Sequence, residues 1–328
     1  MMKKTLGILV LLVVICLITW YQNPVFLKPF NVSNLLNRTG LFGVIAIGVS
    51  FVIITGGIDL SIGSVVCLTG CLLPYLLFEH EWGVIPALIA VAFVSVMLGL
   101  IHGLLITKLN IQPFIVTLCG LLIYRGVARW FTADDTMGFK NEFETLKLLV
   151  TWKMPLFAKY QIPITLLIML GLAVVAGVFL NQTIYGRYLF ALGRNEQAAK
   201  YSGINTDNMK IMAYIICSAT AGLGGVMFAL DLNSIQPAGA GNFYELYAIS
   251  AAVLGGCSLR GGEGTILGVV IGTAVMRVLR NSIGLIGIDD RLEFTIIGVV
   301  LLIGVIVDEI VKRYAAKRRA SIEAKSSG

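Results

Sequence analysis

Charge is scarce in this sequence, and histidine is almost absent. Only 13% of the 328 residues are charged and 57% are hydrophobic, whereas a typical soluble domain is about 25% charged. The two histidines, His80 and His102, lie too far apart in the chain to suggest a metal site. The composition therefore excludes an ordinary soluble domain, and we expect apolar surface to face lipid along most of the chain.

Signatures of catalysis are also missing. No Gly-Lys pair occurs anywhere in the chain, which excludes the phosphate-binding loop of an ATPase. The sequence shows neither a nucleophile–base pair nor a metal-binding cluster, and its six cysteines lack the spacing of a zinc site or a disulfide framework. We therefore predict a protein that is not an enzyme, with no catalytic residue, no metal site and no cofactor bound by this chain.

The net charge of +7 is not distributed as in a nucleic-acid-binding protein. Lys and Arg residues gather at the ends of apolar segments, and they form no patch interleaved with exposed aromatic residues. The positive-inside rule produces this distribution in membrane proteins, so nucleic acid is not expected as a partner.

Long apolar runs take the place of the missing charge. A helix of about 20 residues crosses the hydrocarbon core of a bilayer, and the 36 glycines suit closely packed helices. We predict an all-α polytopic membrane protein in which a single transmembrane domain, 1–328, contains about ten transmembrane helices. The expected segments are 5–22, 39–55, 64–78, 84–106, 114–130, 161–180, 209–230, 245–256, 264–283 and 292–312.

The distribution of basic residues predicts the orientation of the chain. An even number of spans places both termini on one side, and that side carries about twice as many Lys and Arg residues as the other. Both termini are therefore expected in the cytoplasm, together with the loop 181–208 and the basic tail 313–328, which would contact anionic membrane lipid. The loop 131–160 would be periplasmic, as either a solvated connector or a docking surface for a soluble partner.

The N-terminus allows two interpretations. Lys3 and Lys4 precede an apolar run of about sixteen residues, as they would in a cleaved signal peptide. Because no small-x-small cleavage site precedes the polar residues Gln22 and Asn23, a retained first helix is favoured.

Few charged residues fall within the expected helices. The carboxylates, such as Asp59, lie at segment ends, which argues against an ion-coupled carrier because such carriers place carboxylates within their spans. Two arginine pairs, Arg125 with Arg129 and Arg277 with Arg280, each share a helix face. We expect these side chains to snorkel outward or to find acidic partners. The candidate acidic partners are Asp289, Asp290 and Glu293.

A glycine motif recurs about 200 residues apart. The pairs Gly56-Gly57 and Gly255-Gly256 each end an apolar run, and each precedes a serine-containing turn and another glycine. Two tight loops would look similar, but transporters often contain two halves with broken helices in matching positions. We predict such a pseudo-repeat with Gly-rich helix breaks, in which each glycine has a positive φ or a close backbone neighbour. Candidates for a substrate path beside the breaks are Asp59, Ser61 and Ser258.

Several segments together resemble one family of membrane proteins. The run 56–64 resembles the Gly-Ile-Asp-Leu-Ser signature of permease subunits from ribose-, xylose- and arabinose-type ATP-driven importers. Residues 236–256 are similar to the strongest sequence block of that family, and 192–205 resemble its cytoplasmic coupling loop. The match also includes Arg125-Gly126 and 258–264, and it runs in order over nearly the whole chain.

The resemblance implies a function and its partners. The chain would be the transmembrane permease subunit of an ATP-binding-cassette importer for a ribose-like monosaccharide in the bacterial inner membrane. A separate ATPase subunit would use ATP and Mg²⁺, a periplasmic sugar-binding protein would deliver the sugar, and a second permease subunit, identical or different, would complete the pore. The alternatives are a branched-chain amino acid permease of the same architecture and an ion-coupled secondary carrier.

The resemblance also assigns coupling to the ATPase to one loop. Gly193 and Gly203 would end turns on either side of a short helix, 194–202, and an exposed Glu196 would pair with a basic residue of the ATPase. Tyr247 departs from the family pattern, which has Asp at this position. The expected coupling residues are Gly193, Arg194, Asn195, Glu196, Ala198, Lys200, Ser202 and Gly203.

Overall fold

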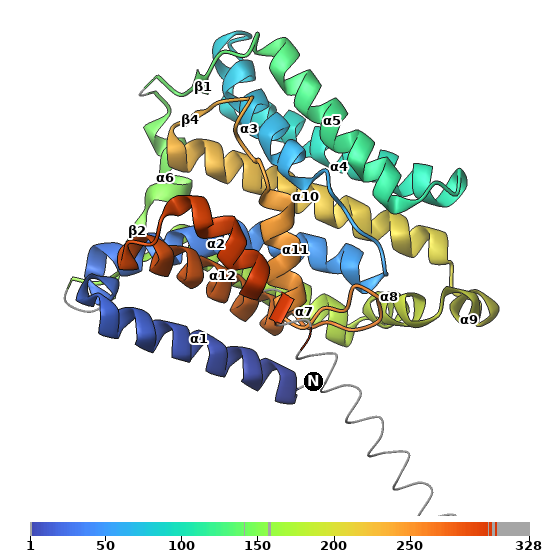
Figure 1. The fold of residues 1–328 in the computed structure, drawn as a ribbon. Helices are drawn as coiled ribbons and strands as arrows, with labels where there is room; N and C mark the ends of the chain where they lie inside the picture. The colour runs from blue at the N-terminus through green and yellow to red at the C-terminus, as the bar shows by residue number, and fades with distance from the viewer. Residues whose placement is uncertain (1, 141, 157–158, 301, 304–305, 307–328) are drawn as a thin grey trace, which may run out of the picture.

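Helices make up most of the computed structural model, which describes residues 2–140, 142–156, 159–300, 302–303 and 306 (Figure 1). Six of the described helices are long and apolar enough to cross a membrane, and three more carry shorter apolar stretches. The all-α fold class is confirmed. The long helices are α2 (Pro29–Ile54), α4 (Val84–Lys108), α5 (Pro113–Phe131), α7 (Ile164–Gln182), α10 (Thr206–Leu232) and α12 (Ile266–Ile286). The shorter apolar stretches belong to α1 (Met2–Gln22), α3 (Ile62–Phe78) and α11 (Tyr244–Leu254).

Nine of the ten segments expected from the sequence correspond to these helices. The tenth, 292–312, is helical over 293–300, and most of its remainder lies outside the described residues. The main difference is at α2, which begins about ten residues earlier than expected because Asn34 and Arg38 lower the hydropathy of its first turns. Pro29 stands in the first turn of α2, where a helix tolerates proline.

One expected segment is too short to cross a membrane as a helix. α11 has 11 residues, which makes about 17 Å of helix, roughly half the thickness of the hydrocarbon core. The irregular segments 236–243 and 255–265 flank this helix. Irregular backbone is tolerated at membrane depth where protein surrounds it, and α11 packs against α2 and α12.

α2 and α10 form the centre of the bundle. All of α2 from Thr39 to Ile54 is buried, and α10 packs across α2, α3 and α4. Gly99 and Gly103 of α4 permit a close approach, because a Cβ at either position would lie 2.6 Å from a backbone Cα of α10. Small residues at this spacing commonly bring membrane helices together.

The outer helices present apolar side chains to their surroundings. α4, α5 and α7 bury less than a third of their most apolar stretches, and they expose residues such as Phe93, Leu122 and Val174. Apolar surface on this scale suits contact with lipid rather than with water. The structure therefore fits a multi-pass membrane protein.

One end of the bundle carries a small folded cap (Figure 1). Two short strands far apart in the sequence, β1 (Met137–Gly138) and β4 (Ser234–Ile235), pair there in antiparallel fashion. Phe139 is fully buried beneath the cap, so the expected loop 131–160 is folded over much of its described length, and only 141 and 157–158 lie outside the description. The other elements of the cap are α6 (Glu144–Thr151), β2 (Lys153–Pro155) and β3 (Gln161–Pro163).

The opposite end of the bundle carries two short helices, α8 (Ile184–Arg194) and α9 (Glu196–Tyr201) (Figure 1). The N-terminal end of α1 lies at this same end of the bundle. Two 3-10 helices, η1 (Pro24–Leu27) and η2 (Asp290–Leu292), lie between α1 and α2 and after α12.

Candidate functional site: helix breaks and coupling surface

The first helix break begins where α2 ends. The N–H of Gly57 donates to the carbonyl of Val52 (3.0 Å), and the N–H of Gly56 donates to the carbonyl of Ile53 (2.9 Å). This pair of bonds is the Schellman motif, which needs a left-handed residue after the helix. Gly56 supplies it with a φ of +81°. The chain then runs irregularly to Ile62, where α3 begins.

The second break repeats this ending at α11. Gly256 donates to the carbonyl of Val253 (2.9 Å), Cys257 donates to the carbonyl of Ala252 (3.0 Å), and the φ of Gly256 is +93°. The other glycine of each pair stands in a close approach. A Cβ on Gly57 would lie 2.8 Å from the hydroxyl of Tyr214, and one on Gly255 would lie 2.7 Å from the amide nitrogen of Val269. Gly56 and Gly256 therefore have the expected positive φ and Gly255 has the expected close backbone neighbour, whereas Gly57 is crowded only by side-chain atoms.

The two breaks contact each other and the end of α8. The N–H of Gly262 donates to the carbonyl of Ile54 (2.8 Å). A Cβ on Gly261 would lie 2.7 Å from the carbonyl oxygen of Gly193 and 2.8 Å from the nitrogen of Gly56. A Cβ on Gly193 would collide with the Ile54 carbonyl and the Gly262 nitrogen. Three segments far apart in the sequence thus meet backbone to backbone, and we call this contact the glycine junction.

Helix-capping residues define α8 and α9. The hydroxyl of Thr183 accepts from the N–H of Gly186 at the start of α8, and the side-chain oxygen of Asn195 accepts from the N–H of Ala198 at the start of α9 (3.0 Å). Gly203, with a φ of +80°, ends α9 in a third Schellman motif. The expected helix 194–202 is therefore shorter, because Asn195 caps a new helix and Arg194 belongs to α8.

Glu196 corrects one expectation about the coupling loop. It was expected to be free for a partner protein, but both of its carboxylate oxygens accept from the ammonium group of Lys210 on α10 (2.8 Å each). Lys200 adds a second ion pair at 3.3 Å. Partial burial raises the pKa of Glu196, yet these two lysines outweigh that effect and hold the pKa below its usual value. The carboxylate therefore ties α9 to α10 within the chain.

The remaining expected coupling residues lie on the outside of α8 and α9. Arg194, Asn195, Ala198, Lys200, Ser202 and Gly203 are all exposed. Two tyrosines of the same two helices are exposed as well, Tyr185 at 53% and Tyr201 at 88%. Tyrosine and arginine are enriched at protein interfaces, so the exposed Tyr185, Tyr201 and Arg194 suit a surface that binds another protein.

The three residues expected beside a substrate path differ in their contacts. Asp59 and Ser61 are buried, and one oxygen of Asp59 accepts from both the N–H and the hydroxyl of Ser61 (2.9 and 2.6 Å). The second oxygen of Asp59 has no hydrogen-bond partner among the described residues. Ser258 instead holds its own turn, where its hydroxyl accepts from the N–H of Arg260 (3.3 Å). A path along Asp59 and Ser61 therefore requires the first break to move.

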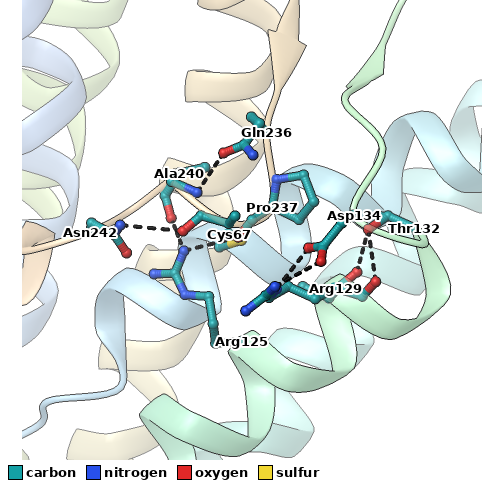
Figure 2. Close-up of polar contacts among 12 residues, drawn as sticks. Cys67, Arg125, Arg129, Thr132, Asp134, Gln236, Pro237, Ala240 and Asn242 are labelled. Atoms are coloured by element: carbon teal, nitrogen blue, oxygen red, sulfur yellow. Dashed lines mark hydrogen bonds and ion pairs between the residues drawn. The ribbon is translucent and has the colours of Figure 1, made fainter.

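Arg125 holds the irregular segment before α11, a contact that was not predicted from the sequence. Figure 2 shows Arg125 of α5 pointing at the backbone of Pro237 and Ala240, and its guanidinium donates to both carbonyls. The thiol of Cys67 on α3 also donates to the Pro237 carbonyl (3.3 Å). The run of Pro, Ala and Gly over 236–241, which breaks helices, was the signal that could have located this segment.

Two of the four arginines that were expected to snorkel or to find acidic partners do pair with a carboxylate. Arg129 pairs with Asp134 (2.7 Å; Figure 2), and Arg280 pairs with the expected Glu293 (3.1 Å). Arg125 uses backbone carbonyls instead of a carboxylate. Arg277 is 5% exposed, so it does not snorkel.

Comparison with known proteins places this chain among transport permeases. The model of the family described as branched-chain amino acid transport system / permease component matches residues 31–305. The chain belongs to this family. It is 36% identical to the ribose import permease protein RbsC of Bacillus subtilis (strain 168), over 92% of this chain and 91% of that protein. No solved structure matches the chain.

Further relatives in this family are also permeases. RbsC of Escherichia coli (strain K12) is 34% identical over 93% of this chain and 92% of that protein. The galactose/methyl galactoside import permease protein MglC of the same organism is 32% identical over 95% of each chain. These matches confirm the family resemblance, and they place the chain among membrane-transport subunits rather than enzymes.

Proposed function

We propose that this chain is the transmembrane permease subunit of an ATP-binding-cassette importer that carries a ribose-like monosaccharide across the bacterial inner membrane. The similarity to ribose and galactose import permeases over nearly the whole chain supports the sugar class. The observation that carries the mechanism is the glycine junction, in which the end of α8 contacts both helix breaks through backbone atoms.

The coupling surface lies on α8 and α9 in this proposal. A separate ATPase subunit, which uses ATP and Mg²⁺, binds the exposed residues around Arg194 and Lys200 and moves the two helices as a unit. Close-packed contacts transmit displacement better than flexible side chains do. Because Gly193 touches the backbone at Ile54 and Gly262, movement of α8 displaces both breaks together. The ion pair of Glu196 with Lys210 adds a second connection, to α10.

The substrate path runs beside the two breaks. Asp59 and Ser61 reach it only when the first break shifts, because both are buried in this conformation, and Ser258 lies beside the second break. A second permease subunit, identical or different, supplies the other wall of the pore. The ATPase can shift the equilibrium between closed and open states only by binding them with different affinity.

The cap and the coupling surface face opposite sides of the membrane in this arrangement. The start of α1 lies at the same end of the bundle as α8 and α9 (Figure 1), which supports a cytoplasmic N-terminus. A cytoplasmic C-terminus rests on the basic tail 313–328, which lies outside the described residues. The periplasmic sugar-binding protein would dock at the cap, where Leu148 and Trp152 are exposed.

Transport by the reconstituted complex tests the function. The full chain is placed in proteoliposomes with its ATPase and its binding protein, and uptake of radiolabelled ribose is measured with and without ATP. We expect uptake that requires ATP and the ATPase, and that excess unlabelled ribose abolishes. Uptake driven by an ion gradient without the ATPase would contradict the proposal.

A branched-chain amino acid is the second candidate cargo, favoured by the description of the family model. The same vesicles distinguish the two candidates when radiolabelled leucine replaces ribose. ATP-dependent accumulation of leucine, with none of ribose or galactose, would support the second candidate.

A further inference from the structure

A cavity of about 410 Å³ lies between α2, α12, the end of α10 and the start of α11. Three arginines line it, Arg38, Arg277 and Arg280. At 1.5 Å of rise per residue, Arg277 lies about 14 Å from the nearer end of α12, and it is only 5% exposed. Basic groups at such depth in a membrane protein are costly and generally have a partner or a function.

The acidic groups around the cavity leave one positive charge unbalanced. Arg38 pairs with Asp231 (3.3 Å), and Arg280 pairs with Glu293 (3.1 Å). Among the described residues, no carboxylate forms an ion pair with Arg277. The cavity therefore carries an excess of one cation at its most buried arginine.

Aromatic rings hold Arg277 in place without using its hydrogen-bond donors. Its guanidinium carbon lies 3.8 Å from the ring centroid of Phe42 and 5.3 Å from that of Tyr247. Rings contact the face of a guanidinium, whereas its N–H groups point outward in its plane. The Nη2 atom of Arg277 has no hydrogen-bond partner among the described residues. Tyr247 is fixed in turn by donating its hydroxyl to Glu293 (2.9 Å).

We propose that this cavity binds a phosphate group, with Arg277 as the buried anchor and Arg38 and Arg280 at its edge. The guanidinium fork matches phosphate oxygens in geometry and charge. A neutral sugar could accept the same hydrogen bonds, but it would leave the excess charge unbalanced. Two kinds of ligand carry such a group, an anionic lipid with its phosphate headgroup and a soluble phosphate. The inference does not depend on which solute the chain transports.

Thermal unfolding of the full chain in lipid nanodiscs tests the proposal and separates the two sources. One arm titrates inorganic phosphate against chloride at constant ionic strength, in nanodiscs of phosphatidylcholine. The other replaces part of the phosphatidylcholine with phosphatidylglycerol. We expect the unfolding midpoint to rise in at least one arm. The Arg277→Gln variant should raise about tenfold or more the phosphate concentration, or the phosphatidylglycerol fraction, that gives half of this response, because a charged hydrogen bond is lost.

The control variant is Arg129→Gln, which removes an arginine that pairs with Asp134 outside the cavity. It should keep the full response, and this separates the cavity from a general effect of membrane charge. If Arg277→Gln fails to fold, Arg38→Gln decides, because its side chain is 43% exposed and should still weaken the response. A response to phosphate identifies a soluble ligand, and a response to phosphatidylglycerol alone identifies a lipid. No response in either arm, or an equal response in the cavity variants, would overturn the proposal.

Discussion

Replacing Gly193 with alanine should uncouple ATP hydrolysis from transport. The new Cβ would collide with the carbonyl of Ile54 and the nitrogen of Gly262, which are backbone atoms that cannot rotate away. Overpacking of this kind costs about 1–3 kcal/mol. Separating the two segments would also break the hydrogen bond from Gly262 to Ile54 (2.8 Å), which is worth about 1 kcal/mol.

The two effects together oppose the docked glycine junction by about 2–4 kcal/mol. Alanine favours the helical backbone of α8 by up to about 1 kcal/mol, which is too little to compensate. Because 1.4 kcal/mol corresponds to a tenfold change, the docked arrangement should become at least several-fold rarer. The exposed face of α8 and α9 is unchanged, so the ATPase should still bind.

The assay is ATP-dependent ribose uptake in proteoliposomes, measured with ATP hydrolysis and complex assembly in the same preparation. The matched control is Gly171→Ala on α7, where a Cβ would meet no atom within 4 Å. We expect Gly193→Ala to assemble and hydrolyse ATP but to lose most of its uptake, while Gly171→Ala transports normally. Uptake by Gly193→Ala at the rate of the control would refute the coupling role of the glycine junction.

Three other predictions follow from the same structure. Gly256→Val should abolish uptake or assembly, because its φ of +93° is strained for a β-branched residue; normal uptake would make this break an ordinary loop. Glu196→Gln should speed amide hydrogen exchange in α9 at neutral pH. The pKa of Glu196 is held low in the folded protein. The ion pair with Lys210 should therefore stabilise α9 fully above a pH of about 4.3, and this stabilisation should be lost only as the pH falls through the lower pKa of the folded protein. Equal exchange in both proteins would show that the ion pair does not stabilise α9. A cysteine within 135–155 should react with an impermeant reagent from outside the cell, whereas one at Gln197 should react only after permeabilisation, and the reverse pattern would contradict the proposed orientation.

Hydropathy and charge were sufficient to predict most of the helices. Long apolar runs such as 84–106 leave little choice of structure in a membrane, and α4 covers this run with two more residues. The start of α2 was missed because its polar residues face protein partners, as Asn37 does in donating to Asp231 (2.7 Å). Composition alone cannot distinguish a polar helical turn inside a protein from one in water.

The glycine pairs were recognisable from the sequence, but their mutual contact was not. A Schellman ending depends on local residues, so Gly56 and Gly256 could be assigned a backbone role without a structure. Contact between Gly193 and Ile54 depends on how distant helices pack, and no local pattern records it. Glu196 was misjudged for the same reason, because its partner Lys210 lies beyond the turn at Gly203.

The most direct test of the central claim is a pair of distances measured by double electron–electron resonance in the assembled complex. One pair of spin labels is placed at Gln197 on α9 and Arg260 in the second break, which are both exposed. The other joins Gln197 to Trp82, which follows α3 near the cap, where Phe78 packs on Phe143. If α8, α9 and the breaks move as a unit, ATP should change the Gln197–Trp82 distance and leave the Gln197–Arg260 distance unchanged. A change in the Gln197–Arg260 distance on addition of ATP would contradict the claim that the glycine junction transmits the movement.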